Sequence, residues 1–341
     1  MILETEPVCK SKDTEETWQQ SLAGAITDPK ELFELLDLNL KHLPAAVQAD
    51  KTFSLRVPRN FINRMVKGDW NDPLLKQFLP IAQEFDLQPG YTADPVGEKN
   101  TNPRPGLIHK YHGRVLLIVS GGCAINCRYC FRRHFPYAEN NPGRQQWSST
   151  LDYIANDSSI SEVILSGGDP LAASNSLLSG LVQQIAAIPH VKTLRVHSRM
   201  PVLIPQRIDK ECLHWLTSSR LNPVMVIHCN HANELNEATG TALSQLRNAG
   251  VTLLNQSVLL AGVNDDPTIL RNLSERLFAF GVLPYYLHLL DKVQGAAHFD
   301  VEQDHASKIV AELIETLPGY LVPKLVKEQA GARSKTPISL Y

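Results

Sequence analysis

Six short apolar runs alternate with amphipathic segments between residues 114 and 290, and this alternation constrains the fold more than any other feature of the chain. The runs are RVLLIVS (114–120), SEVILSG (161–167), VKTLRVHS (191–198), NPVMVIHC (222–229), VTLLNQSVLL (251–260) and VLPYYLHLL (282–290). Strands that alternate with helices predict a parallel sheet covered by helices. We therefore expect an α/β fold, and specifically an incomplete (β/α)6 barrel. A doubly wound open sheet is the alternative, because periodicity does not distinguish a closed sheet from an open one.

The regions on either side of these units have a different character. Residues 1–90 contain the segments 31–43 and 73–85, whose apolar residues recur every three or four positions, which predicts a helical N-terminal region. Residues 91–113 are rich in Pro, Gly and Asn and are expected to form a linker. The partial barrel would then span 114–318, followed by a C-terminal segment at 319–341.

Charge and hydropathy exclude several classes of partner. The 33 Lys and Arg residues nearly balance the 35 Asp and Glu residues, so the net charge of −2 gives no overall attraction to nucleic acid or anionic lipid. The first twenty residues are charged and polar, without the apolar core of a signal peptide, and no stretch approaches the roughly 18 apolar residues of a membrane span. We expect a cytoplasmic protein that binds neither nucleic acid nor membrane.

Three cysteines, Cys123, Cys127 and Cys130, follow the first core strand directly. This is the carboxyl end of a parallel strand, where such folds place their chemistry. Closely spaced thiolates suit zinc or an iron–sulfur cluster. Zinc would need a fourth ligand, for which His134 is the nearby candidate, whereas a [4Fe–4S] cluster held by three cysteines keeps one iron open. The remaining cysteines are remote, and Cys212 and Cys229 are expected to be small buried hydrophobes.

The cysteine pattern C-x3-C-x-Φ-C, with Tyr129 as the aromatic residue, resembles the signature of radical S-adenosylmethionine enzymes. The resemblance implies that the open iron binds S-adenosylmethionine. It also implies that the glycine-rich turn ILSGGDP lines the methionine end of that cofactor with Ser166, Gly167, Gly168 and Asp169. The other strand ends would place Ser198, His228, Asn230 and Gln256 at the same rim.

Longer segments resemble lysine 2,3-aminomutases. They are HKYHGR (109–114), CRYCFRRHF (127–135), ILSGGDPL (164–171), RMPVLIPQRI (199–208), NQSVLLAGVND (255–265), PYYLHLLD (284–291) and the terminal SKTP. In that family the lysine of KTP binds pyridoxal 5′-phosphate, so the resemblance assigns this role to Lys335. It also places Lys110, Tyr111 and Arg114 at that cofactor. The implied reaction is the isomerisation of (S)-α-lysine to (R)-β-lysine.

The resemblance also implies substrate contacts. Arg132 matches the arginine that pairs with the substrate carboxylate, and Asp291 matches one of two aspartates that receive the ε-ammonium group. Glu328 replaces the second aspartate, which keeps the charge and changes the reach.

The chain ends six residues after Lys335 and so resembles the short bacterial aminomutases, which lack a zinc-binding extension and supply (R)-β-lysine for the modification of elongation factor P. Free lysine would be the substrate, a separate ligase would use the product, and a reductase or flavodoxin-type protein would donate the electron. Three alternatives remain: a catabolic or antibiotic-pathway lysine or glutamate 2,3-aminomutase, a radical S-adenosylmethionine enzyme that modifies RNA, and a non-catalytic metal scaffold.

Overall fold

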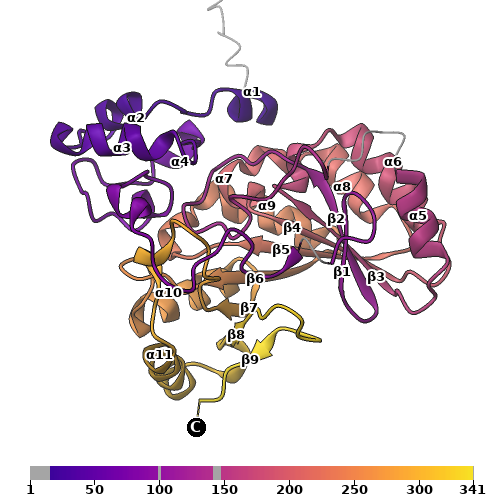
Figure 1. Cartoon of the computed structure of the whole chain (residues 1–341). Helices are drawn as coiled ribbons and strands as arrows, with labels where there is room; N and C mark the ends of the chain where they lie inside the picture. Colours follow the sequence, from indigo (N-terminus) through magenta and orange to yellow (C-terminus); the bar gives the residue numbers. More distant parts are fainter. Residues whose placement is uncertain (1–15, 99–100, 141–146, 341) are drawn as a thin grey trace, which may run out of the picture.

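A nine-stranded sheet forms the centre of the computed structural model, which describes residues 16–98, 101–140 and 147–340 (Figure 1). The strands lie in sequence order from β1 to β9; β2 to β8 are parallel, and β1 and β9 run antiparallel at the two edges. The bounds are β1 Leu107–Tyr111, β2 Arg114–Ser120, β3 Glu162–Gly167, β4 Thr193–Ser198, β5 Asn222–His228, β6 Thr252–Val258, β7 Leu283–His288, β8 Lys324–Lys327 and β9 Thr336–Pro337.

All six predicted core strands are confirmed as β2 to β7. The sequence analysis did not predict β1, β8 or the two-residue strand β9. Strand β1 lies inside the segment predicted as a linker, and β8 is a seventh parallel strand of only four residues, too short for its alternation to be read. The parallel α/β class expected from the sequence is therefore correct, and the sheet is larger at both edges than we predicted.

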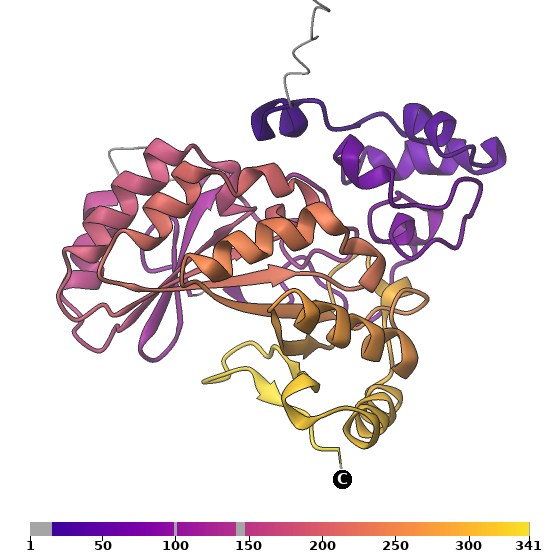
Figure 2. The same cartoon turned by 180° about the vertical axis from the view of Figure 1, so that it is seen from behind.

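Helices connect the parallel strands and cover one face of the sheet, as Figure 2 shows from behind. They are α5 Trp147–Ala155, α6 Asn175–Ala186, α7 Met200–Leu203, α8 Lys210–Thr217, α9 Glu237–Asn248, α10 Pro267–Ala279 and α11 Gln303–Thr316. Their starts are encoded locally. In α10, for example, the Asp266 carboxylate accepts from the Thr268 and Ile269 amides, and Pro267 occupies the first turn, where its missing N–H costs nothing.

The N-terminal region is helical in short pieces: α1 Trp18–Ala23, α2 Pro29–Leu35, α3 Leu43–Asp50 and α4 Arg59–Ile62 (indigo in Figure 1). The predicted helix at 31–43 is interrupted near Asp37, whose φ of 52° is left-handed, and the chain resumes as a 3₁₀ turn at Leu40–His42.

The predicted helix at 73–85 is wrong. This segment forms two 3₁₀ turns, Leu75–Gln77 and Ala82–Phe85, and Pro80 between them can neither donate a helical hydrogen bond nor let the preceding residue adopt a helical conformation freely. Residues 1–15, which include Cys9 and the segment in which we expect no signal peptide, lie outside the described residues.

The face of the sheet opposite the helices carries both apolar and charged side chains. Leu116, Ile164 and Arg195 are register partners on β2, β3 and β4, and all three line an internal cavity. Alternate residues of each strand point to the same face, so His197 shares the cavity side with Arg195, whereas Leu194 and Val196 pack in the apolar core.

The two edges of the sheet approach each other through side chains. Lys110 on β1 contacts Glu328, the residue after β8, with 2.8 Å between Nζ and Oε1. No backbone ladder joins β1 to β9 within the described residues. The cavity is therefore enclosed by a sheet whose ends are linked by an ion pair.

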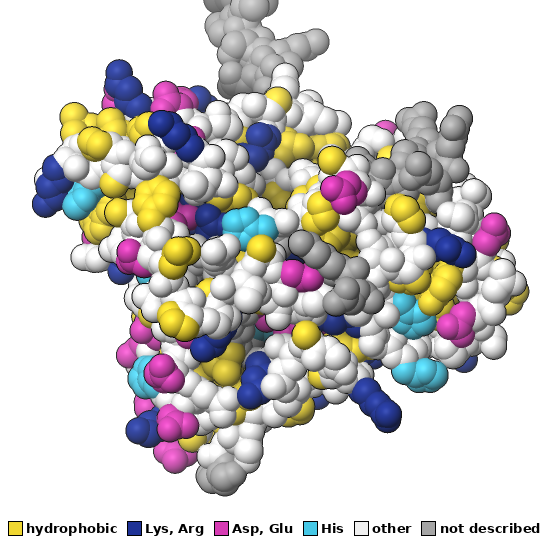
Figure 3. Space-filling view, in the orientation of Figure 1, with side chains coloured by type: hydrophobic (Ala, Val, Ile, Leu, Met, Phe, Trp, Pro, Cys, Tyr) yellow, Lys and Arg dark blue, Asp and Glu magenta, His cyan; other side chains and the backbone are white. Residues whose placement is uncertain are grey.

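The outer surface carries mixed charge. On the face shown in Figure 3, basic and acidic side chains are interspersed. In the three described stretches of the chain, no helix combines the length and the apolar character needed to cross a membrane.

Candidate active site

Two adjoining cavities lie on the face of the sheet opposite the helices. One, of about 180 Å³, is lined by Cys123, Cys127 and Cys130 and is called the cysteine cavity here. The other, of about 260 Å³, is lined by Lys335 and is called the lysine cavity. The lining residues common to both are Phe131, Arg132, Ser166, His197, His228, Gln256 and Asp291. A molecule in one cavity therefore adjoins a molecule in the other.

The cysteine loop is held by the N-terminal region. The buried Arg128 guanidinium makes a bidentate pair with Glu84, with Nε–Oε1 and Nη2–Oε2 distances of 2.8 and 2.5 Å. Arg133 Nη2 also reaches Glu84 Oε2 at 2.7 Å. The Arg128 backbone amide donates to the Gln77 carbonyl at 2.8 Å. One buried carboxylate from the 3₁₀ turn Ala82–Phe85 thus fixes two arginines that flank Cys130.

The donor set fits an iron–sulfur cluster better than a single ion. In the described parts of the chain, no group of three or more His, Cys, Asp or Glu side chains is spaced to hold one metal ion. Three thiolates that each bind a different iron need not converge on a point, whereas zinc ligands must. His134, the candidate fourth zinc ligand, contacts the Gln294 carbonyl at 3.4 Å and does not line the cysteine cavity.

Burial keeps the Cys123 and Cys130 thiols protonated in the absence of iron. It raises the pKa of Cys123 well above the ordinary value, and it raises the pKa of Cys130 to about 11, with the neighbouring Cys127 adding to the effect. Iron binds thiolates, so assembly of a cluster in this loop releases protons.

The glycine turn packs against the cysteine loop. The Gly168 amide donates to the Ser120 carbonyl at 2.7 Å, and the Asp169 amide donates to the Gly122 carbonyl at 2.8 Å. A Cβ atom at position 168 would lie 2.5 Å from the Gly122 carbonyl oxygen. The absence of a side chain at Gly168 thus lets these two amides approach the neighbouring loop, and the turn lines the cysteine cavity from there.

Three neutral histidines face the cavities. Burial lowers the pKa of His228 to about 3 and lowers the pKa of His197 and His288 well below the ordinary value. His228 contacts Gln256, with 3.1 Å between their Nε2 atoms. The Nε2 atoms of His197 and His288 are buried, and neither has a hydrogen-bond partner among the residues that the structure describes. Orphaned polar atoms are rare in protein interiors, so these two indicate a polar occupant of the cysteine cavity.

The lysine cavity centres on Glu328. Its Oε2 atom lies 3.0 Å from Lys335 Nζ, its Oε1 atom lies 2.8 Å from Lys110 Nζ, and the Tyr111 hydroxyl donates to the same oxygen. Burial alone would raise the pKa of Glu328, but the charges of Lys335 and Lys110 outweigh it and hold this pKa well below the ordinary range.

Arg114 is a free cation in the lysine cavity. In the part of the chain that the structure describes, it makes no hydrogen bond or ion pair, and its guanidinium lies 5.0 Å from the centre of the Tyr111 ring. An unpaired guanidinium beside an amine suits a phosphate-bearing cofactor that forms a covalent bond to lysine. The chemistry of this donor set therefore fits pyridoxal phosphate.

Arg132 and Asp291 lie where the two cavities meet. Arg132 makes a buried bidentate pair with Glu98, with both distances 2.7 Å, and its Nη1 lies 3.3 Å from both the Ser166 hydroxyl and the Gly167 carbonyl. The Asp291 carboxylate makes no hydrogen bond or ion pair within the described residues. Burial, together with the charge of Glu328, raises the pKa of Asp291 to about 7.

The structure brings together the residues that the two resemblances singled out for the site. Cys123, Cys127, Cys130, Gly167, Gly168, Asp169, Ser198 and Asn230 line the cysteine cavity; Lys335, Lys110, Tyr111, Arg114 and Glu328 line the lysine cavity; Ser166, His228, Gln256, Arg132 and Asp291 line both. Sequence reasoning missed Glu98, His197, Arg199 and His288, which also line the cavities. His197 and His288 share the inward faces of β4 and β7 with Arg195 and Tyr286, which line the lysine cavity, so strand alternation could have grouped them.

Comparisons with known proteins agree with this geometry. Residues 112–198 match the family model described as a 4Fe-4S single cluster domain. Over 326 residues, which cover 95% of both proteins, the chain is 52% identical to L-lysine 2,3-aminomutase of Escherichia coli (strain K12). It is 50% identical to the Haemophilus influenzae protein of the same name over 98% of both chains. It is 34% identical to that of Clostridium subterminale over 94% of this chain and 77% of the relative.

The parallel α/β sheet, the three-cysteine loop and the matched cluster domain define an iron–sulfur enzyme of the radical S-adenosylmethionine class. Within that class, the chain belongs to the L-lysine 2,3-aminomutase family and is an isomerase of the aminomutase type. Membership implies three cofactors: a [4Fe–4S] cluster, S-adenosylmethionine and pyridoxal 5′-phosphate.

Proposed function

We propose that this chain converts (S)-α-lysine to (R)-β-lysine in a reaction that depends on pyridoxal phosphate. The observation that carries the proposal is the adjacency of the two cavities, one lined by three cysteines and the other by Lys335. A radical generated at the cysteine cavity would need to travel only into the neighbouring space to reach the substrate. The same adjacency supports an incomplete (β/α)6-type barrel, extended by β8, with a C-terminal segment that binds pyridoxal phosphate.

The cysteine cavity would hold the cluster and S-adenosylmethionine. Cys123, Cys127 and Cys130 would bind three irons and leave the fourth open. The neutral His197 and His288 each have an Nε2 atom that no described residue binds and that a polar ligand would meet. S-adenosylmethionine bound to the reduced cluster supplies the radical that abstracts hydrogen.

The lysine cavity would hold pyridoxal phosphate and the substrate. Lys335 would bind the cofactor covalently, with Arg114 pairing with its phosphate and Tyr111 beside it; the cofactor supplies the electron delocalisation that the isomerisation needs. Arg132 has one terminal nitrogen, Nη1, outside its pair with Glu98, and this atom would meet the substrate carboxylate. Asp291, with no partner of its own in the described residues, would receive the ε-ammonium group.

Glu328 would take part in substrate binding through a shared carboxylate. It already binds Lys110 and Lys335, so an added ε-ammonium group has to share its oxygens or replace one of these partners. If Lys335 binds the cofactor covalently, it would no longer occupy Glu328 Oε2 as a charged amine, and this oxygen would be free for the substrate. The substitution of glutamate for the family aspartate supports the further proposal that the product is used to modify elongation factor P in the cytoplasm. A separate ligase would attach it, and a reductase or flavodoxin-type protein would supply the electron.

The decisive experiment compares Lys335→Ala with Lys327→Ala, a matched lysine on β8 that does not line the cavities. Each protein is reconstituted anaerobically with iron, sulfide and pyridoxal phosphate and is given isotopically labelled lysine, S-adenosylmethionine and dithionite. We expect the K335A protein to keep its iron and to lose both the yellow cofactor absorbance and β-lysine formation, and we expect the K327A protein to keep all three. Yellow absorbance that survives in the K335A protein would contradict the lysine assignment, and faster turnover of glutamate than of lysine would contradict the substrate.

A further inference from the structure

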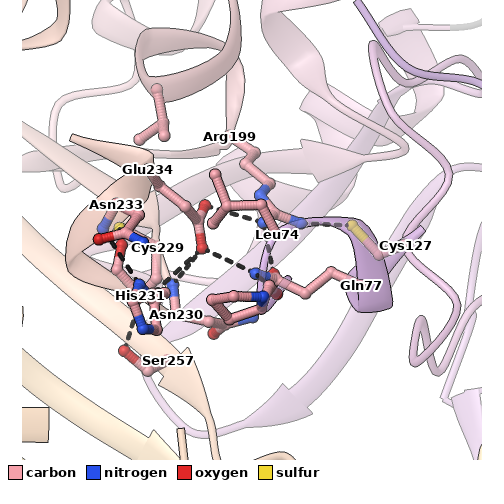
Figure 4. Close-up of polar contacts among 12 residues, drawn as sticks. Leu74, Gln77, Cys127, Arg199, Cys229, Asn230, His231, Asn233, Glu234 and Ser257 are labelled. Carbon is pink, nitrogen blue, oxygen red and sulfur yellow. Dashed lines mark hydrogen bonds and ion pairs between the residues drawn. The ribbon is translucent and has the colours of Figure 1, made fainter. Parts of the chain in front are cut away.

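One arginine donates directly to a cluster cysteine. Arg199 follows β4 and lines the cysteine cavity, and its Nη1 lies 2.8 Å from Cys127 Sγ and 2.9 Å from the Tyr129 hydroxyl. The side chain is buried, and Figure 4 shows it lying between Cys127 and Glu234. Neither the cysteine pattern nor the aminomutase resemblance assigned it a role.

The position of this guanidinium is fixed from its far side. Arg199 Nη2 donates to Gln77 Oε1 at 2.6 Å and to Glu234 Oε2 at 2.8 Å. Glu234 is fully buried, and its other oxygen accepts from the Asn230 and His231 amides at 2.9 and 3.1 Å. The guanidinium therefore has little freedom to rotate away from the cysteine.

The charges of this network are ordered in space. The positive guanidinium lies next to the sulfur, and the negative Glu234 carboxylate lies on the opposite side of the guanidinium (Figure 4). Burial alone would lower the pKa of Arg199, but the charge of Glu234 outweighs it and raises this pKa, so Arg199 stays positive. In a buried site a nearby charge acts far more strongly than it does in water.

We propose that Arg199 is a positioning residue that makes the iron–sulfur cluster easier to reduce. The inference rests on the proposed binding of a [4Fe–4S] cluster by Cys123, Cys127 and Cys130. The step concerned is the uptake of one electron by the oxidised cluster from a low-potential one-electron reductant, with no bond made or broken. The added negative charge spreads over the cluster and its thiolates, where the hydrogen bond and the positive charge of Arg199 stabilise it.

Two substitutions should shift the cluster potential in opposite directions. Arg199→Gln removes the positive charge, so at a fixed potential the ratio of reduced to oxidised cluster should fall about tenfold, which is about 59 mV for one electron. Glu234→Gln removes the opposing negative charge and keeps one acceptor oxygen, so the ratio should rise. Arg199→Lys keeps a positive charge and loses the planar guanidinium. The ratio of reduced to oxidised cluster should therefore fall less in the R199K protein than in the R199Q protein.

The test is a redox titration of each reconstituted protein without S-adenosylmethionine, with the reduced cluster measured by electron paramagnetic resonance. Arg220→Gln is the matched control. Arg220 lies just before the start of β5, donates to the carbonyls of Ala186, Ile188 and Val191, and does not line the cysteine cavity. Its potential should equal that of the unaltered protein.

Each outcome decides the inference. The inference is supported if the ratio of reduced to oxidised cluster falls in the R199Q or R199K protein and rises in the E234Q protein. Equal potentials in all proteins overturn it and leave the proposed cluster site intact. Loss of the cluster from all three network variants also overturns it, because the network would then hold the loop and not set the potential. An unaltered protein that binds no cluster would refute the proposed site itself.

Discussion

At the scale of single residues, the pKa values of two carboxylates in the lysine cavity are shifted in opposite directions. Asp291 has no partner among the described residues, and burial raises its pKa to about 7. Glu328 lies between two lysines, and its pKa is depressed. At neutral pH Glu328 is therefore fully charged and Asp291 is partly protonated, so Asp291 is the one whose charge a cationic ligand can change.

The pH dependence of substrate capture should follow Asp291. Only the ionised carboxylate attracts an ammonium group, so kcat/KM for lysine should fall as pH falls below about 7, and this limb should be absent in the D291N protein. Asp291→Asn should also lower kcat/KM at pH 8 by about tenfold to a hundredfold, since a hydrogen bond to a charged group contributes about 1.5–3 kcal/mol. Steady-state kinetics from pH 6 to 9 would check this. An identical acidic limb in both proteins would assign it to another group.

The same residue should weaken the fold as the pH rises. A raised carboxyl pKa means that the folded state binds the proton more tightly than the unfolded state, so stability is lost between about pH 4 and pH 7. Asp291→Asn removes this cost and should increase the free energy of unfolding by up to about 4 kcal/mol at pH 8, with little change at pH 4. Urea denaturation of cofactor-free protein at both pH values measures the difference, and equal stability at pH 8 would contradict the raised pKa.

At the scale of elements, the glycine turn after β3 and the cysteine loop after β2 form one unit. Their backbones are bonded through Ser120 and Gly122, and Gly168 leaves no room for a side chain. The turn is therefore part of the support that shapes the cysteine cavity.

Substitution of that glycine should disturb the cysteines. Gly168→Ala places a methyl group 2.5 Å from a backbone oxygen and should cost about 1–3 kcal/mol of stability while lowering the iron bound per chain. Gly180→Ala is the control. Apart from the adjacent residues and the backbone of α6 itself, no described atom lies within 4 Å of its Cβ position, and alanine there should increase stability by about 0.5–1 kcal/mol. Thermal unfolding and iron analysis compare the two, and full iron binding by the G168A protein would show that the loop adapts.

Elements whose own residues determine their structure could be predicted, whereas elements that depend on distant partners could not. The strands β2 to β7 are encoded by runs of apolar residues, and all were found. The two-residue strand β9 depends on pairing with β8, which was itself not predicted, and β1 was hidden in a segment whose Pro, Gly and Asn content indicated a linker. Motif residues such as Cys127 and Lys335 were found from their spacing and resemblance, whereas Glu98 was not, because only the fold brings it to Arg132.

At the scale of the whole molecule, the N-terminal region supports the candidate active site. Glu84 is buried with Arg128 and Arg133, and Gln77 contacts Arg199. Residues 73–85, which were wrongly predicted as an α-helix, form two 3₁₀ turns that place Gln77 and Glu84 against the cysteine loop and Arg199.

Breaking that contact should affect both the fold and the cluster. Glu84→Ala leaves two buried arginines without their carboxylate and should cost about 3–5 kcal/mol. Glu31→Ala removes a carboxylate from a more exposed pair with Arg59 and should cost at most about 1 kcal/mol. Denaturant unfolding followed by iron analysis tests both. An E84A protein as stable as the E31A protein would contradict the supporting role of Glu84.

The lysine cavity has a consequence for how its cofactor arrives. Its lining includes five cationic side chains, Lys110, Arg114, Arg132, Arg195 and Lys335, and three acidic ones, Glu98, Asp291 and Glu328. A chain with a net charge of −2 therefore keeps a local surplus of positive charge inside. A dianionic phosphate ester diffusing towards the opening would be drawn inwards although the molecule as a whole repels it, and added salt would slow its capture by shielding that attraction.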